Sequence, residues 1–316
     1  MAPTESQEVL APLTSAAIFL TFTVRQGAEA TVRDVLGDVS GIRRSVGFRA
    51  PEARLSCIAG IGSDLWMRMI TTSAPAELHP FVALDGGKHR APATPGDLLF
   101  HLRADRLDLC FELGKQLAQR LEGVADVVDE VHGFRSFDER DVLGFVDGTE
   151  NPEGAAAAGA VLVGDEDSVH RGGSYVIVQK YFHDLAGWNA LSVEAQEQAI
   201  GRTKLDDWEF PDEDKAPNAH IKLNVIEEDG VQRQILRANM PFGRIGAREF
   251  GTYFSGYART PAVTEEMLRR MFVGDPPGTT DRILDFSTAQ TGCLFFAPRV
   301  DFLDGLSADV SDPSRG

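Results

Sequence analysis

The predicted strands and helices follow nearly the same order in the two halves of the chain, with one extra strand in the second. In the first half, the apolar stretches predict strand, helix, strand, strand, helix and strand at Ala16–Val24, Ala30–Val46, Leu55–Gly62, Asp97–Leu102, Leu107–Leu121 and Val124–Val131. In the second half they predict a strand, a helix, three strands, a helix and a strand at Gly173–Tyr181, Ser192–Gly201, His220–Ile226, Val231–Ala238, Thr252–Ala258, Thr264–Phe272 and Gly292–Ala297. Two such halves with mainly antiparallel pairing indicate an α+β fold of duplicated ferredoxin-like domains.

Local patterns support individual elements of this scheme. Leucines recur every fourth residue from Leu109 to Leu121, which is typical of one helix face. Asp229-Gly230 favours a tight hairpin between the strands at His220–Ile226 and Val231–Ala238. Gly37 and Gly41 weaken the helix that contains them, so its end is uncertain.

The halves are expected to be residues 1–145 and 146–316. The boundary is predicted near 135–170, in the acidic segment rich in Gly and Ala around Glu153–Asp167. At 316 residues, the chain is long enough for two ordinary domains with cores of their own.

The charge balance excludes some partners. With 48 acidic and 31 basic residues the net charge is −17, which argues against nucleic acid and anionic membranes as partners. Cys57, Cys110 and Cys293 lie in apolar stretches without a CxxC pair, so we expect buried free thiols and no zinc site. No Lys or Arg precedes Arg25, so a secretory signal is not predicted, and a cytoplasmic location is the default expectation.

A short turn, Gly144–Pro152, presents a lone carboxylate between two glycines. Gly148 permits a positive φ and leaves no Cβ, so the backbone can approach a bulky planar ligand closely. Pro152 stiffens the end of the turn, and Asp147 is therefore presented from a rigid elbow. Taken alone, these residues also suit an ordinary Asp-Gly surface turn.

The sequence of this elbow, Gly-Phe-Val-Asp-Gly-Thr-Glu-Asn-Pro, resembles the GxxDG signature of the dye-decolorizing peroxidases, specifically the bacterial B-type branch. His220 in Ala-Pro-Asn-Ala-His-Ile-Lys-Leu-Asn resembles the proximal haem ligand of that family. Arg237 and Asn239 in Ile-Leu-Arg-Ala-Asn-Met-Pro-Phe-Gly resemble its distal arginine and asparagine. The similarity runs from about Thr14 to about Leu303. It implies a fold of the dimeric α+β barrel type, with haem b held in the C-terminal half.

The resemblance implies a role for each matching residue. His220 is the expected axial ligand of the haem iron, with Asp281 as the carboxylate partner of its second nitrogen and Asp285 in reserve. On the opposite face of the haem, Asp147 is expected to carry a proton of the peroxide, and Arg237 to stabilise negative charge. Arg237 should also favour the ionised form of Asp147 against the effect of burial.

Other residues are expected around the haem. Asn239 would position the peroxide or a bridging water, although a turn residue before Pro241 is the simpler reading. Arg237 is an alternative clamp for a haem propionate. Thr149, Glu150 and Asn151 are expected to line the haem edge, and Arg202 is expected to pair with a haem propionate. The alternative for each is an ordinary loop residue or solvated charge.

The predicted function is that of a haem b peroxidase. It would reduce hydrogen peroxide and oxidise organic donors such as dyes and phenols through a ferryl intermediate. The alternative is a haem-binding or haem-handling protein with incidental peroxidase activity. We expect a homo-oligomer. A role as cargo of an encapsulin shell is not expected, because the tail Ser307–Gly316 is short and polar, without an apolar docking segment.

Overall fold

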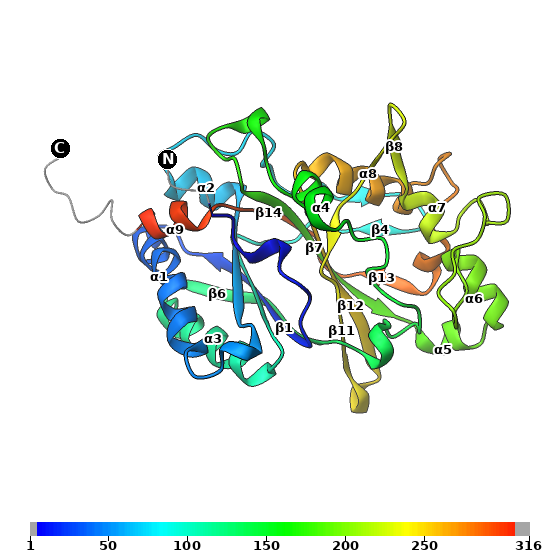
Figure 1. Ribbon diagram of the computed structural model, residues 1–316, viewed down its shortest axis with the longest axis horizontal. Helices are drawn as coiled ribbons and strands as arrows, with labels where there is room; N and C mark the ends of the chain where they lie inside the picture. Colours follow the sequence, from blue (N-terminus) through cyan, green and yellow to red (C-terminus); the bar gives the residue numbers. More distant parts are fainter. Residues whose placement is uncertain (1–4, 307–316) are drawn as a thin grey trace, which may run out of the picture.

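The computed structural model describes residues 5–306, and a ten-stranded sheet runs through both halves of the chain (Figure 1). The tail Ser307–Gly316, on which the expectation about encapsulation depends, lies outside the described residues. The strands of the first half are β1 (Ala16–Val24), β2 (Ser56–Gly62), β5 (Leu98–Ala104) and β6 (Ala125–Phe134). Those of the second half are β7 (Ser174–His183), β10 (Leu236–Arg237), β11 (Met240–Arg244), β12 (Glu249–Ala258), β13 (Ser287–Ala289) and β14 (Cys293–Ala297).

Each half has the strand order of a ferredoxin-like domain. In the first half the order is β2-β5-β1-β6, and in the second β12 and β7 lie between β10 and β11 on one side and β13 and β14 on the other. The strands pair antiparallel, and β14 also pairs with β2 through Phe295 opposite Gly62, which joins the two sheets. The predicted α+β fold of duplicated ferredoxin-like halves is confirmed.

The joined sheet encloses an apolar interior between the two halves. Strand β11 packs against β6, so the two edges of the joined sheet lie close together. The rings of Phe19 from the first half and Tyr253 from the second stack there with centroids 4.1 Å apart. Val176 and Phe295 belong to the same buried cluster. This shared core fixes the two halves against each other.

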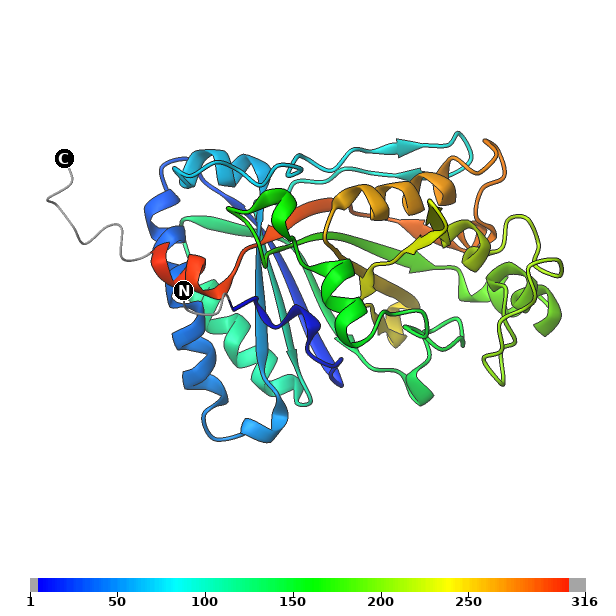
Figure 2. The same ribbon diagram turned by 45° about the horizontal axis from the view of Figure 1, so that its top comes forward.

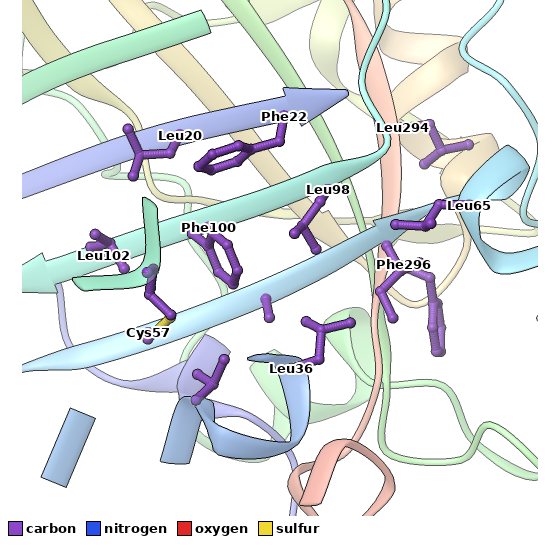
Figure 3. Packing of buried hydrophobic residues seen from close by; sticks show 14 of the residues in the cluster. Leu20, Phe22, Leu36, Cys57, Leu65, Leu98, Phe100, Leu102, Leu294 and Phe296 are labelled. Carbon is purple, nitrogen blue, oxygen red and sulfur yellow. The ribbon is translucent and has the colours of Figure 1, made fainter. Parts of the chain in front are cut away.

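The other face of the sheet is covered by helices. Those that pack against it include α1 (Glu29–Gly47), α2 (Ser63–Met69), α3 (Leu107–Arg120) and α8 (Pro261–Phe272). The other helices of the described chain are α4 (Gly154–Val161), α5 (Leu185–Asn189), α6 (Val193–Ile200), α7 (His220–Asn224) and α9 (Val300–Leu306). Figure 3 shows Phe22 and Phe100 on neighbouring strands, on the sheet face that packs with Leu36 of α1. Helix α9, near the end of the chain, returns to pack on α1 (Figure 2).

Most predicted elements are present within a few residues of their expected bounds. Helix α1 continues through Gly37 and Gly41, because its apolar face, including Val35 and Leu36, is buried against the sheet. Helix α6 begins after Ser192, whose hydroxyl accepts a hydrogen bond from the Ala195 amide, and it ends at Gly201 with φ = 102°.

The strand predicted at His220–Ile226 is wrong. His220 begins the short helix α7, and only β8 (Ile226–Glu228) is extended. Alternating apolar residues suit both structures, and the Asn224 side chain favours the helix by donating to the His220 carbonyl at 2.7 Å. The Asp-Gly hairpin itself is confirmed, with Asp229 and Gly230 at φ = 53° and 74° between β8 and β9 (Val231–Arg233).

The strand predicted at Val231–Ala238 is interrupted. It divides into β9 and β10, and β10 pairs with β12 instead of continuing the hairpin. This change of partner brings Arg237 onto the main sheet opposite Gly256.

Several features bear on the remaining expectations. Helix α4 occupies the segment in which the boundary was predicted, and it packs against β10 and β12. Cys57, Cys110 and Cys293 are buried free thiols. A small hairpin of β3 (Leu84–Asp85) and β4 (Arg90–Ala91) completes the strands. Within residues 5–306, no helix combines the length and apolar character needed to cross a membrane.

Candidate active site

The elbow at Gly144–Pro152 is held by backbone and side-chain hydrogen bonds. Gly144 and Gly148 have φ values of 93° and 87°, the conformation for which glycine was predicted there. The Asp147 amide donates to the Glu139 carbonyl at 3.1 Å. The Asn151 side chain donates to the Arg237 carbonyl and accepts from the Arg237 amide, both at 2.8 Å. These two hydrogen bonds hold the elbow against β10.

A cavity of about 950 Å³, counting its open mouth, lies beside the elbow in the C-terminal half. Much of its wall is apolar and comes from α6, α8, β12 and the segment before β10: Ile200, Ile235, Phe254, Met267, Leu268 and Met271. The polar groups of the wall include His220, Asp147, Arg237 and Asn239, so the cavity brings together four residues predicted from the sequence.

His220 is oriented by a buried carboxylate. Its Nδ1 atom lies 2.7 Å from Oδ2 of Asp281, which is 0% exposed, while Asp281 Oδ1 accepts from the Ile283 amide at 3.0 Å. A carboxylate partner fixes the Nδ1–H tautomer and leaves Nε2 with a free lone pair. Asp285, the reserve candidate, instead contacts His89 at 3.0 Å and forms ion pairs with Lys88 and Arg282.

Asp147 lies beside an amide and a guanidinium. Asn239 Nδ2 donates to Asp147 Oδ1 at 3.3 Å, and Asn239 Oδ1 accepts from the Ser255 amide at 3.2 Å. Burial raises the pKa of Asp147 above its ordinary value, and the Asn239 hydrogen bond and the charge of Arg237 only partly oppose this shift. The expected competition is present, but burial is the stronger effect.

Among residues 5–306, no carboxylate lies within ion-pair distance of the Arg237 guanidinium. Burial lowers its pKa, while the charges of Asp147 and Glu150 oppose that change. In the described part of the chain, the only hydrogen-bond acceptor that its guanidinium contacts is the Met267 sulfur at 3.8 Å. A half-buried guanidinium with so weak a partner is available to an anionic or polar ligand.

Arg202 is enclosed by the loop that follows the elbow. It is 5% exposed, donates to the Thr149 hydroxyl, and forms ion pairs with Glu150 at 3.0 Å and Asp207 at 2.7 Å. Thr149, Glu150 and Arg202 line a second opening of the cavity region, next to His220. The Asn151 amide is instead occupied by the Arg237 backbone, and its contact with a haem edge stays a prediction.

Asp141 and His183 also line the cavity, and neither was predicted from the sequence. Asp141 precedes the elbow, and its carboxylate accepts from the amides of Leu143 and Phe145. His183 contacts the hydroxyls of Ser287 and Thr252, and burial lowers its pKa to about 4. An Asp three residues before a glycine was a usable turn signal for Asp141, whereas nothing in the sequence around His183 marks it.

The donor set of the cavity fits a haem. Haem b is a wide apolar ring that carries iron and two carboxylates, so it needs apolar walls, an axial donor and nearby cations. The free Nε2 of His220 supplies the donor and the apolar residues supply the walls. Within the part of the chain that the structure describes, Arg237 forms no ion pair with a carboxylate, and the buried Nε–H of Arg202 has no hydrogen-bond partner.

Family models match almost all of the chain. The model described as Dyp-type peroxidase, N-terminal, matches residues 6–135, and the model described as Dyp-type peroxidase, C-terminal, matches residues 138–302. A dye-decolorizing peroxidase of Mycolicibacterium paratuberculosis is 62% identical over 303 residues, which cover 96% of this chain and 86% of that protein. One from Rhodococcus erythropolis is 59% identical and covers 99% of this chain and 96% of that protein.

Solved structures of similar proteins share the fold. The encapsulated DyP-type peroxidase of Mycobacterium smegmatis has a TM-score of 0.94 at 62% identity, covering 95% of this chain and 98% of that one. DyPB of Rhodococcus jostii has a TM-score of 0.92 at 56% identity, and the match covers 94% of this chain and 97% of that one. A variant of the latter, solved in complex with haem, has a TM-score of 0.93 at the same identity, covering 95% and 98%.

The residues matched by the two family models, 6–135 and 138–302, cover both halves of the chain. Since the relatives are named as peroxidases, a haem-handling protein with incidental activity is not favoured. The chain belongs to the dye-decolorizing peroxidase family, whose members are haem enzymes that reduce hydrogen peroxide and oxidise organic donors.

Proposed function

We propose that the cavity of the C-terminal half would hold haem b, with His220 as the residue that would bind its iron and with Asp147, Arg237 and Asn239 as the residues that handle peroxide. The observation that carries the proposal is a single cavity that contains both an imidazole held by a buried carboxylate and an aspartate beside an unpaired guanidinium. When bound, the haem supplies the iron that takes oxidising equivalents from peroxide and passes them to organic donors.

Asp281 controls the state of His220. The contact of 2.7 Å between Nδ1 and Oδ2 keeps the proton on Nδ1, and the negative charge makes the imidazole more electron-rich. An electron-rich imidazole is the stronger donor at Nε2, which suits an iron that must lose electrons. Because Asp281 is fully buried and accepts a backbone amide as well, its orientation is fixed by the fold.

Asp147 is the proposed proton carrier. Asn239 binds one of its oxygens, Oδ1, and the other remains for a proton of hydrogen peroxide. The raised pKa makes its carboxylate a stronger base than an exposed aspartate, which favours removal of a proton from one peroxide oxygen and its return to the other. Asn239 is itself held by the Ser255 amide, so it keeps the carboxylate in place.

Arg237 is the proposed electrostatic stabiliser. A guanidinium in a buried site interacts strongly with negative charge that develops on a nearby oxygen. Asn151 fixes the backbone of Arg237 from both its amide and its carbonyl, so the guanidinium starts from a braced strand. Arg202 and the adjoining Thr149 and Glu150 would face the haem edge at the second opening.

The assignment of Asp147 and Arg237 is tested by replacing each one separately. We expect Asp147→Asn and Arg237→Gln to slow the change of the haem absorption spectrum on mixing with hydrogen peroxide, each by about 10²-fold or more. Glu122→Gln, a change at an exposed residue that does not line the cavity, is the control for a lost charge. If both site variants react at the wild-type rate, the assignment is wrong.

The remaining partners are inferred at a coarser level. We expect hydrogen peroxide and organic reductants as substrates, a cytoplasmic location, a homo-oligomeric state, and no nucleic-acid or membrane partner at a net charge of −17. The Mycobacterium smegmatis relative is encapsulated, so a protein shell is a candidate partner to examine. Size-exclusion chromatography of the protein, alone and coexpressed with a shell protein, tests both the oligomer and the shell.

A further inference from the structure

Asp141 is bound into the turn that leads to the elbow. Its Oδ1 atom accepts hydrogen bonds from the amides of Leu143 and Phe145, both at 3.0 Å. Its backbone amide donates to the Phe145 carbonyl at 2.8 Å, and its carbonyl accepts from the Gly144 amide at 3.1 Å. One carboxylate oxygen therefore closes the turn from which Asp147 is presented.

The second oxygen of Asp141 is not used in this way. Among residues 5–306, no side chain hydrogen-bonds Oδ2, although Asp141 lines the same cavity as Asp147. Two carboxylates in one cavity of low dielectric constant repel each other, which disfavours the state in which both are ionised. The proposed role of Asp147 requires its ionised form. The repulsion therefore disfavours the ionised form of Asp141 and favours its protonated form.

Among the described residues, no positively charged side chain forms an ion pair with Asp141. Lys204 is close enough for its charge to be felt, but its Nζ atom donates to Gln196 at 2.6 Å. The other charged or titratable groups near Asp141 or on the cavity wall are Arg140, Asp147, Tyr181, His183, His220 and Arg237. Within the described chain, none of these side chains hydrogen-bonds or ion-pairs with Asp141. Burial and the charge of Asp147 raise the pKa of Asp141 to about 7.

We propose that Asp141 is a positioning residue that remains a neutral carboxylic acid in the weakly acidic range, with Oδ1 holding the elbow and the proton on Oδ2. The proposal rests on the proposed function, because it assigns the one negative charge of the pair to Asp147. A neutral Asp141 offers an O–H donor to water in the cavity and adds no charge that would repel the ionised Asp147. The pair then holds a single proton until the pH rises to near neutrality.

Infrared difference spectroscopy of the holoenzyme tests this directly. A protonated carboxyl has a C=O stretching band that an ionised carboxylate lacks. We expect the wild type to show such a band at pH 6 and to lose it by pH 8, and Asp141→Asn to lack it at both values. The amide oxygen of Asn still accepts from Leu143 and Phe145, so this variant removes the proton and keeps the turn.

Three comparisons make the result specific. Labelling the aspartate carboxyls with ¹³C shifts the band of the wild type if an aspartate carries it, even where Asp141→Asn does not fold. In Asp147→Asn the repelling charge is gone, so the band should disappear at a pH lower by about one unit or less. Glu122→Gln should leave the band unchanged.

The outcomes separate the two proposals. If the wild type shows no aspartate band at pH 6, or if the band persists in Asp141→Asn, the protonation of Asp141 is refuted. If the band behaves as expected but Asp147→Asn reacts with peroxide at the wild-type rate, the distal role of Asp147 fails and the protonation of Asp141 stands. A second readout is thermal unfolding, in which Asp141→Asn should gain on the wild type as the pH rises from 6 to 8, because it avoids burying a charge. An equal loss of stability in Asp141→Asn and Asp141→Ala at pH 8 would overturn the proposal.

Discussion

The contact between His220 and Asp281 can be tested by one amide substitution. In Asp281→Asn, the side-chain oxygen can still accept from the Ile283 amide at the position of Oδ1. The NH2 group then replaces Oδ2, which is 2.7 Å from His220 Nδ1, and two donors would face each other. The imidazole avoids this by moving its proton to Nε2, and a protonated Nε2 cannot bind iron.

The size of the effect follows from the type of hydrogen bond that is lost. A hydrogen bond to a charged group contributes about 1.5–3 kcal/mol. Since about 1.4 kcal/mol corresponds to a factor of ten, haem affinity should fall roughly 10- to 100-fold. Because Asp281 is fully buried, solvent does not screen the interaction, and the upper part of this range is expected.

The assay is the rate at which the holoenzyme loses haem to excess apomyoglobin. Asp285→Asn is the matched control, since Asp285 lies in the same turn but contacts Lys88, His89 and Arg282. We expect haem loss about 10- to 100-fold faster in Asp281→Asn and nearly unchanged in Asp285→Asn. Haem loss at the wild-type rate in Asp281→Asn, or faster loss in Asp285→Asn than in Asp281→Asn, would refute the reasoning.

Three other predictions concern stability. Arg202→Ala should lower the free energy of unfolding by about 3 kcal/mol, because removal of the buried guanidinium leaves Glu150 and other carboxylates unpaired. Chemical denaturation measures this free energy, and an unchanged value would contradict the prediction. Asn151→Ala removes two hydrogen bonds to the Arg237 backbone and should cost about 2 kcal/mol in the same assay, with a wild-type midpoint as the opposing result. His183 has a pKa of about 4 when folded and about 6.5 when unfolded, so the unfolded state binds the extra proton between these values. Stability should therefore be complete above pH 6.5 and fall by at most about 3 kcal/mol as the pH drops to 4, and His183→Gln should show a flatter pH profile.

The periodic elements of the fold could be predicted from the sequence because each one buries an apolar face. The helix around Leu109–Leu121 and the strand at Ala16–Val24 have patterns that only one structure satisfies well. The segment at His220 could not be resolved in this way. Its few apolar residues suit a strand or a short helix, and the Asn224 side chain, which is not part of the pattern, favours the helix.

The candidate site could be predicted from the sequence where its residues lie close together in one motif. Asp147 and Asn151 lie in one elbow, and the contact of Asp281 with His220 was expected from a family pattern and is present in the structure. Interactions between distant segments carry no such signal. The link from Asn151 to the Arg237 backbone and the place of His183 in the cavity depend on strand pairing, which the local sequence does not encode.

The absorption spectrum of the purified protein, produced with ample haem precursor and compared with His220→Ala, tests the central claim most directly. We expect a strong Soret band in the wild type, with the shape of a histidine-ligated haem, and its loss or marked displacement in the variant. A colourless wild-type protein, or an unchanged spectrum in His220→Ala, would contradict the account.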